Sequence, residues 1–259
     1  MSNKLEEIAA FKRREVAEAK QARPLALLER ELKGRTPPRG FAAAIRRPGR
    51  LSLIAEIKKA SPSAGPIRPE ADVARVAQTY ARAGAQAISV LTDAKFFSGS
   101  LKDLAVAREK VPLPVLRKDF LLEEYQLVEA AAAGADAVLL IVALLDPITL
   151  KRLLALARDL SLDALVEVHS EPELQQALGA DSKVIGVNNR DLATLRVDLK
   201  TAEQLMKRIP ADRARVSESG IRSRRDVEFV QAQGADAILV GEELMSSDDP
   251  AAKIKELMG

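Results

Sequence analysis

The chain has 259 residues, of which 47% are hydrophobic and 30% charged, and this composition is typical of a folded globular protein rather than a disordered one. No apolar run reaches the ~18 residues that a membrane-spanning helix needs, and the charged start MSNKLEEIAAFKRREVAEAK lacks the apolar centre of a signal peptide. The absence of cysteine excludes disulfides and thiolate chemistry, so we expect a cytoplasmic protein without membrane contact.

The net charge of +3 and the pI of about 9.1 raise the question of a nucleic-acid partner. Lys and Arg are scattered, however, and most have Asp or Glu nearby, as in LEEIAAFKRREVAEAK. Only 3% of residues are aromatic and tryptophan is absent, so platforms for stacking single strands are not expected. The composition argues against nucleic acid, whereas a surplus of positive charge suits an anionic small-molecule substrate.

Residues 1–50 are predicted to form a helical extension. The residue pattern predicts a helix over 4–21 and a second one over 25–34. RTPPRGF, at 35–41, is predicted to be a linker because its prolines and glycine oppose regular structure. The first buried strand then follows at 52–58.

Beyond residue 50 one unit recurs, a helix that ends in Gly-Ala and leads into a short run of β-forming residues. It appears as AGAQAISVL, AGADAVLLIV, LGADSKVIGV and QGADAILVG. The glycine suits a helix C-terminus, and the apolar run is too short for a helix but right for a buried parallel strand. With the intervening runs LPVLRKDF, LDALVEVH and RARVSESG, the predicted strands are 52–58, 86–91, 114–118, 136–141, 163–168, 183–187, 214–218 and 236–240.

Eight β-α units within residues 51–259, with no second zone of composition, predict one α/β domain over residues 1–259. It is a closed (β/α)₈ TIM barrel with an N-terminal helical extension of residues 1–50. The alternative is a doubly wound open sheet, which usually has fewer strands. Its dinucleotide-binding form carries G-x-G-x-x-G after the first strand, and this chain lacks that motif. We therefore favour the barrel and expect no cofactor.

Ionisable or amide side chains end five of the eight predicted strands. In such a barrel the chemistry lies at the C-terminal strand ends. A single charge there is usually just solvated, but five strand ends of this kind favour a shared site. Because side chains alternate across a strand, the terminal groups are expected to converge on one mouth. These groups are Glu56, Lys58, Lys118, Glu167, Asn188, Arg190, Glu218 and Ser219.

Lysines and glutamates that lie close together indicate acid–base chemistry. Partial desolvation lowers the pKa of a lysine and raises that of a glutamate, which brings both toward neutral pH. A metal site is not expected, because the chain has one histidine and the lysines would repel a divalent cation. The strand ends therefore predict an acid–base enzyme without a metal.

Glycines and serines after three strands predict a phosphate site. SESG and VGEELM follow the last two strands, whose loops commonly form the phosphate cradle of such barrels. Gly220 and Gly241 would let backbone N–H groups approach phosphate oxygens, and Ser61 and Ser63 would add hydroxyls from the first loop. Simple turn formation is the alternative for each glycine.

Aromatic residues cluster at loops. Phe96, Phe97 and Phe120 make up half of the phenylalanines, and their position suggests a wall that binds an aromatic ring, with core packing as the alternative. His169 lies just past Glu167, where we expect a hydrogen-bonding residue rather than a catalyst.

Seven blocks occur in the order and at the spacing of one known family. They are IAEIKKASPS, LTDAKFFSGS, PVLRKDF, GADAVLLIV, EVH, GVNNRDL and VSESGI. The chain thus resembles the indole-3-glycerol phosphate synthase family of tryptophan biosynthesis over about residues 50–247, and that family also has a helical extension before its first strand. The resemblance implies a carbon–carbon lyase that acts on a phosphorylated small molecule, 1-(2-carboxyphenylamino)-1-deoxyribulose 5-phosphate, and we expect a monomer rather than a dimer.

The resemblance also implies residue roles. Lys118 would be the general acid of ring closure, and Lys58 would bind the substrate carboxylate, with protonation of the departing hydroxyl as a second role that stays open. Glu167 would act as acid or base in the dehydration, and Glu56 would either position Lys58 or share that duty. Four further residues would complete the catalytic set and orient the substrate: Asn188, Glu218, Arg190 and Ser219. The phosphate would be held by Ser61, Gly220 and Gly241. The pocket for the aromatic ring would be lined by Phe97, Phe120 and Leu139.

Two positions depart from the family pattern near the phosphate. Family members often have lysine where this chain has Ala64, and many have a small residue where it has Glu242. Two other functions remain as alternatives. One is a related phosphosugar isomerase, which the absence of cysteine disfavours. The other is a phosphate-binding barrel without activity, which the complete lysine–glutamate set disfavours.

Overall fold

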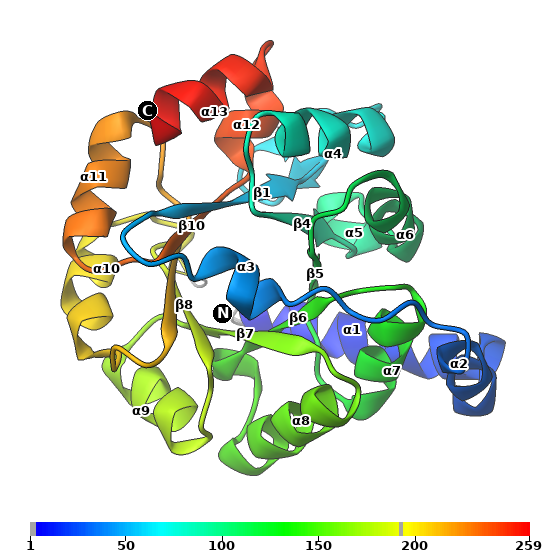
Figure 1. The fold of residues 1–259 in the computed structure, drawn as a ribbon. Coiled ribbons are helices and arrows are strands. Elements are labelled where there is room, and N and C mark those ends of the chain that lie inside the picture. Colours follow the sequence, from blue (N-terminus) through cyan, green and yellow to red (C-terminus); the bar gives the residue numbers. More distant parts are fainter. Residues whose placement is uncertain (1–3, 192–193) are drawn as a thin grey trace.

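Eight parallel strands close into a barrel in the computed structural model, which describes residues 4–191 and 194–259 (Figure 1). The barrel strands are β1 (Ser52–Ile57), β4 (Ala87–Leu91), β5 (Val115–Lys118), β6 (Ala137–Ile141), β7 (Asp163–Val168), β8 (Val184–Asn188), β9 (Ala214–Glu218) and β10 (Ala237–Val240). β1 pairs with both β4 and β10, so the eight-stranded barrel has no open edge. The predicted TIM barrel is confirmed, and each predicted strand lies within one residue of the observed ends.

Helices surround the strands as an outer ring (Figure 1). They are α4 (Val73–Arg82), α6 (Leu101–Lys110), α7 (Glu124–Ala132), α8 (Pro147–Asp159), α9 (Glu171–Gly179), α10 (Lys200–Leu205), α11 (Arg224–Ala232), α12 (Glu242–Ser246) and α13 (Pro250–Met258). The short helix α5 (Ala94–Phe97) follows β4, and β2 (Ala60–Ser61) and β3 (Gly65–Pro66) form a small hairpin after β1.

The predicted glycine C-caps hold for three of the four repeated units. Gly84, Gly134 and Gly234 follow their helices with φ between +88° and +98°, a conformation that glycine adopts without strain. The unit LGADSKVIGV differs, because α9 extends through Gly179 and the left-handed residue is Asp181, with φ of 58°. An Asp tolerates that conformation better than most residues.

Alternation along the strands separates two cores. Residues such as Ile54, Leu116, Leu165 and Leu239 point inward and fill the barrel, while their sequence neighbours pack outward against the helices. Lys118 continues the inward row of Leu116. The same row position on other strands is therefore available for polar groups at the mouth.

The N-terminal extension covers both ends of the barrel. A short helix, α3 (Phe41–Ile45), lies over the N-terminal end, where Phe41 and Ile45 are fully buried against the interior (Figure 1). Burying two such side chains contributes about 1.5–3 kcal/mol each. The predicted linker at 35–41 is thus wrong at its last residue, Phe41, which begins α3. This helix forms because the apolar side chains of FAAAI pack against the open end of the barrel.

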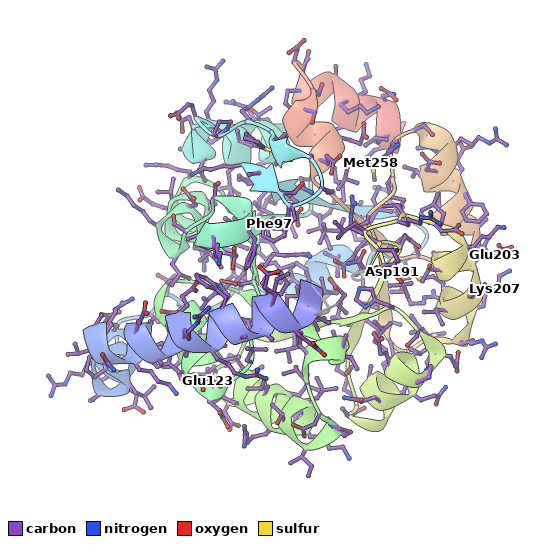
Figure 2. All side chains as sticks on the ribbon, turned by 180° about the vertical axis from the view of Figure 1, so that it is seen from behind. Phe97, Glu123, Asp191, Glu203, Lys207 and Met258 are labelled. Atoms are coloured by element: carbon purple, nitrogen blue, oxygen red, sulfur yellow. The ribbon has the colours of Figure 1, made fainter. Side chains whose placement is uncertain are left out.

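The long helix α1 (Lys4–Ala22) crosses the opposite end, as Figure 2 shows. Ile8 on this helix belongs to the interior core, and Val16 packs with Leu28 of α2 (Leu25–Leu32) and Tyr125 of α7. The mouth of the barrel therefore has a helix above it. Among the described residues, no helix is both long and apolar enough to cross a membrane.

Candidate active site

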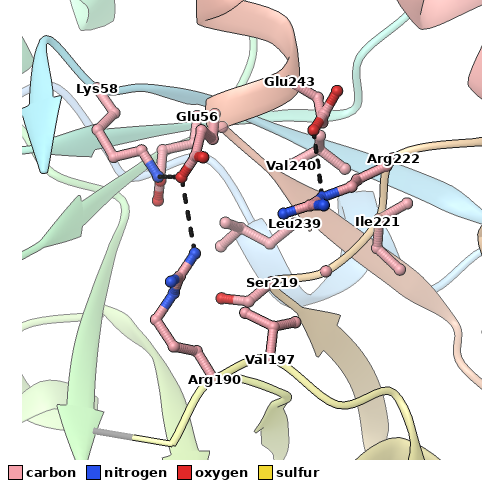
Figure 3. A pocket seen from close by; sticks show the side chains of 13 residues that line it. Glu56, Lys58, Arg190, Val197, Ser219, Ile221, Arg222, Leu239, Val240 and Glu243 are labelled. Carbon is pink, nitrogen blue, oxygen red and sulfur yellow. Dashed lines mark ion pairs between the residues drawn. The ribbon is translucent and has the colours of Figure 1, made fainter. Parts of the chain in front are cut away.

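A cavity opens at the C-terminal mouth of the barrel, below α1. Apart from the two glycines, all the predicted site residues line it: Glu56, Lys58, Ser61, Phe97, Lys118, Phe120, Leu139, Glu167, Asn188, Arg190, Glu218 and Ser219. Gly220 and Gly241 line an adjoining pocket that shares Glu56, Lys58 and Arg190 with it (Figure 3). The structure therefore places these residues in two joined compartments, with Ser61 in the wider one and apart from the glycines.

Lys118 sits at the centre of the charged mouth. Its Nζ lies 3.5 Å from Oε2 of Glu167 and 3.5 Å from Oε2 of Glu218. Both carboxylate side chains are 1% exposed, whereas that of Lys118 is 16% exposed toward the cavity. The Lys118 ammonium group thus contacts two buried carboxyl groups, and its exposed side faces the cavity in which a ligand would bind.

These contacts shift the three pKa values in different directions. Burial alone lowers the pKa of Lys118, but the carboxylates, chiefly Glu167 and Glu218, outweigh burial and hold it above its ordinary value. Burial likewise raises the pKa of Glu167, but Lys118 and His169 outweigh it and hold that pKa well below its usual range. Burial and the charge of Glu167 raise the pKa of Glu218 to about 8.

The expectation of a lysine with a lowered pKa is therefore wrong for Lys118. Lys118 is desolvated, as assumed, but the effect of the neighbouring carboxylates on its pKa is larger than that of desolvation. The distances to these carboxylates cannot be read from the local sequence. A raised carboxyl pKa is found at Glu218 and not at Glu167. At neutral pH the mouth thus holds a charged lysine, an ionised carboxylate and a carboxyl group that keeps its proton.

Gly186 on β8 makes room for Glu218, a role that the sequence did not reveal. A Cβ at this position would lie 2.1 Å from Oε1 of Glu218 and 3.1 Å from Leu165. A glycine inside a strand often marks such a close approach, and that was the available signal in VIGVN.

Glu56 and Lys58 form the second charged group of the mouth. Lys58 Nζ lies 3.6 Å from Oε1 of Glu56, whose other oxygen accepts a hydrogen bond from Ser89 at 3.2 Å. Gly241 is needed beside them, because a Cβ there would lie 2.5 Å from Oε1 of Glu56. The pair expected from the strand alternation is therefore formed, and Gly241 leaves space for a carboxylate.

Glu242 enters the glycine pocket from the start of α12. Its Oε2 lies 4.0 Å from Lys58 Nζ and 3.6 Å from Arg190 Nη2, and Figure 3 shows Arg190 reaching toward this corner. Arg222 and Glu243 form a further ion pair at 3.5 Å on the outer side. The pocket thus contains more charge of both signs than its glycines suggested.

The turn after β9 is held in an unusual backbone conformation. Ser219 and Gly220 are both left-handed, with φ of 63° and 82°. Asn189 secures this turn, since its side-chain amide donates to the carbonyl oxygens of Glu218 and Ser219 at 2.9 and 3.1 Å. A non-glycine residue held this way costs ~1–3 kcal/mol and is typical of functional sites. The sequence interpretation named Asn188 and overlooked Asn189.

One wall of the wider cavity is apolar. The rings of Phe97 and Phe120 lie 6.1 Å apart and line it together with Leu139. Phe96 instead packs edge-on against Phe11 of α1 at 5.8 Å, so it belongs to the helix contact. The extension adds Ile8 to the cavity lining, a contribution that the sequence did not predict.

Comparison with known proteins identifies the family. Residues 5–257 match the family model of indole-3-glycerol phosphate synthase. The chain belongs to the indole-3-glycerol phosphate synthase family. The synthase of Albidiferax ferrireducens is 48% identical over 260 residues, covering 99% of this chain and 98% of that protein. The synthase of Rhodospirillum rubrum is 47% identical over 263 residues, covering all of both chains.

Solved structures agree on the fold. A 3-hexulose-6-phosphate synthase from Salmonella typhimurium has a TM-score of 0.64 at 14% identity, over 80% of this chain and 97% of that one. A thiamine phosphate pyrophosphorylase from Pyrococcus furiosus has a TM-score of 0.61 at 18% identity, over 80% and 93%. At such low identity these likenesses concern the barrel alone.

In this member of the synthase family, a fully buried lysine anchors α1 to the barrel. Lys12 Nζ lies 2.7 Å from Asp93 Oδ2 and 2.9 Å from Asp119 Oδ1. Asp93 follows β4 and Asp119 follows β5, directly after Lys118. Within the helix, Glu15 Oε1 lies 2.9 Å from Lys12 Nζ, as the sequence interpretation expected for the charges of α1, but the two aspartates distant in sequence were not predicted.

His169 links the charged mouth to α9. Its Nε2 lies 3.3 Å from Oε1 of Glu167, and its Nδ1 lies 3.2 Å from Oε2 of Glu173. Burial lowers the pKa of His169, but the two carboxylates outweigh burial and raise it to about 10. In the described part of the chain, no group of three or more acidic or histidine side chains is arranged to hold a metal ion.

Proposed function

We propose that the chain converts 1-(2-carboxyphenylamino)-1-deoxyribulose 5-phosphate to indole-3-glycerol phosphate, with Lys118 as the general acid of ring closure. The observation that carries this assignment is the position of the Lys118 ammonium between two buried carboxyl groups, with its free side toward the cavity. The raised pKa keeps this group protonated at neutral pH, as a proton donor requires.

In the first step the aromatic carbon that bears the carboxylate attacks the ketone, and CO₂ then leaves. Lys118 gives its proton to the ketone oxygen as the carbon–carbon bond forms. Phe97, Phe120 and Leu139 supply an apolar wall against which the anthranilate ring would lie. Lys58 would bind the substrate carboxylate before it departs, and Glu56 holds Lys58 in place.

In the second step Lys58 would give a proton to the new hydroxyl group, which leaves as water, and a proton leaves the neighbouring carbon. Glu167 would take this proton, because its pKa is low and it is ionised in the resting site. Glu218, which keeps its own proton up to about pH 8, would donate a hydrogen bond to a substrate hydroxyl. Asn188, Arg190 and Ser219 line the same space and would orient the ribulose chain.

The phosphate group would bind in the compartment of Gly220 and Gly241. Both glycines lack the side chain that would narrow this pocket, and the left-handed turn at Ser219 and Gly220 opens its floor. Ser61 would contribute its hydroxyl only from the adjoining compartment. Glu242 adds a negative charge here, so a bound phosphate would rely on Lys58 and Arg190 to offset it.

The test is turnover of the carboxyphenylamino substrate by the Lys118→Met variant, followed by indole fluorescence. Loss of a general acid is expected to lower kcat by ~10²–10⁴-fold. Lys151→Met, at an exposed lysine of α8, is the matched control and should match the parent. A Lys118 variant as active as the parent would refute the assignment. No turnover of phosphoribosyl anthranilate is expected, since the isomerase alternative calls for a cysteine that the chain lacks.

A further inference from the structure

The compartment proposed to hold the phosphate, on which this inference rests, contains as many negative side chains as positive ones. Among the described residues, three cations and three carboxylates line it: Lys58, Arg190, Arg222, Glu56, Glu242 and Glu243. Each carboxylate lies within 3.6 Å of one of these cations, so the positive charge is already offset before a ligand enters (Figure 3). A phosphate dianion would therefore bring two uncompensated negative charges into the compartment.

One carboxylate oxygen of this compartment lacks a hydrogen bond. Oε2 of Glu242 is buried, and in the part of the chain that the structure describes no group donates a hydrogen bond to it. The two cations beside it are Arg190 Nη2 at 3.6 Å and Lys58 Nζ at 4.0 Å. Both distances exceed the length of a charge-assisted N–H···O hydrogen bond, which is about 2.7–2.9 Å. Because a buried acceptor without a donor costs free energy, this oxygen is poised to accept a hydrogen bond from a ligand.

A phosphate group that contacts Lys58 and Arg190 comes close to this oxygen, because Oε2 of Glu242 lies within 4.0 Å of both cations. A phosphate oxygen and a carboxylate oxygen repel each other unless a proton lies between them. With one proton retained, the phosphate donates an O–H···O hydrogen bond of about 2.5–2.7 Å to Oε2. The compartment has about 50 Å³ of free volume. This is several times the ~10–15 Å³ that one water molecule needs, so an ion of several atoms fits.

We propose that Glu242 selects the protonated form of the phosphate group, because its Oε2 accepts a hydrogen bond from the P–OH of a phosphate monoanion. The compartment thereby favours oxyanions that keep a proton over oxyanions that cannot donate one. No covalent bond of the ester changes. A free phosphate monoester, whose second pKa is about 6, is mainly a dianion at neutral pH. It takes up one proton from solvent when it binds and returns that proton when it leaves.

Sulfate and hydrogen phosphate separate this hydrogen bond from the effect of charge. In mildly alkaline buffer both are tetrahedral dianions, but only hydrogen phosphate can donate a proton. Titration calorimetry of the parent at constant ionic strength should give a Kd for sulfate about tenfold or more above that for phosphate, as one hydrogen bond to a charged group implies. In Glu242→Gln, whose amide can donate to sulfate, this preference should shrink by about fivefold or more. Most of the change should come from tighter binding of sulfate.

Glu243→Gln is the matched control for the change of charge. It removes one negative charge from the same compartment, but Glu243 pairs with Arg222 at 3.5 Å on the outer side. The ratio of the two Kd values in this variant should stay within about twofold of that in the parent. An equal gain in affinity for both anions in Glu242→Gln would show that Glu242 acts through its charge alone and would overturn the proposal. An unchanged ratio in Glu242→Gln would overturn it as well.

A simple phosphate monoester, glycerol phosphate, tests the retained proton itself. Calorimetry at about pH 7, in two buffers that differ in ionisation enthalpy, counts the protons taken up on binding. The parent and Glu243→Gln should take up nearly one proton, and Glu242→Gln about half as much or less. No uptake by the parent, or equal uptake by the parent and Glu242→Gln, would overturn the proposal. Failure of the proposed function has a different signature, a parent protein that shows these anion affinities but does not turn over the carboxyphenylamino substrate.

Discussion

Replacing Lys12 by methionine should release α1 from the barrel mouth. Lys12 is fully buried and lies within 3 Å of both Asp93 and Asp119. Methionine fills a similar volume but removes the cation that the two carboxylates share, although Asp119 keeps its ion pair with Arg117 at 3.2 Å. Removing one partner of a buried ion pair typically costs ~3–5 kcal/mol, since the remaining charge is uncompensated.

The loss should appear as local undocking rather than as unfolding of the barrel. Apart from Lys12, α1 is held mainly by the burial of Ile8 and Val16, at ~1.5–3 kcal/mol each, and by the Tyr125 hydroxyl, which lies 3.1 Å from the Ala19 carbonyl oxygen. These contributions are of the same size as the loss. Undocking lets both aspartates regain water, so it limits the cost to the rest of the fold.

Hydrogen exchange and kinetics together check this prediction. The amides of α1 should lose protection in Lys12→Met while those of the barrel strands keep theirs, and KM should rise because Ile8 lines the cavity proposed to bind substrate. Lys20→Met is the matched control, since Lys20 forms an exposed ion pair worth only ~0–1 kcal/mol with Glu123. Unchanged protection of α1 in Lys12→Met would refute the reasoning. Asp93→Asn in the same chain should restore part of it.

Three further changes test the site and its support. The pKa of Glu218 is raised from 4.5 to about 8, so the stability it contributes is complete below the first value and is lost as pH rises to the second. As pH rises through this range, the parent should therefore lose unfolding free energy relative to Glu218→Gln, as measured by urea unfolding. A difference between the two proteins that does not change with pH would contradict the raised pKa of Glu218. Gly241→Ala should displace Glu56, whose Oε1 would lie 2.5 Å from the new Cβ, and lower kcat/KM by about tenfold or more while stability stays near that of the parent. Gly99→Ala places a Cβ 2.0 Å from the Leu91 carbonyl oxygen, so urea unfolding should show a loss of ~1–3 kcal/mol or more.

The barrel and its charged mouth could be predicted because both depend on local periodicity. A strand of period two fixes which side chains share a face, so the inward row of Leu116 had to continue to Lys118, as Leu165 continues to Glu167. Closure of the barrel then brings strand ends together whatever their separation in sequence. The repeated Gly-Ala units supplied four of the eight strands, and the apolar runs before and between them supplied the other four.

Contacts that depend on distant partners could not be predicted. Nothing in FKRREV marks Lys12 as buried, since its partners Asp93 and Asp119 lie some 80 to 110 residues away. The pKa of Lys118 is another case, because desolvation and nearby charge act in opposite directions and only the distances decide between them. The short helix at Phe41 was overlooked for the same reason, as its stability comes from the open end of the barrel.

The anchor of α1 and the proposed acid share one strand end, and this has a mechanistic consequence. Lys118 points into the cavity, and the next residue, Asp119, meets Lys12 of α1. Asp119 also accepts a hydrogen bond from Thr92 at 2.6 Å, which fixes it against the end of β4. Because adjacent residues of one backbone cannot move independently, docking of α1 restrains the position of Lys118 as well as covering the mouth. A buried ion pair thus joins the N-terminal extension to the proposed catalytic centre. Movement of α1 would therefore displace the Lys118 ammonium group.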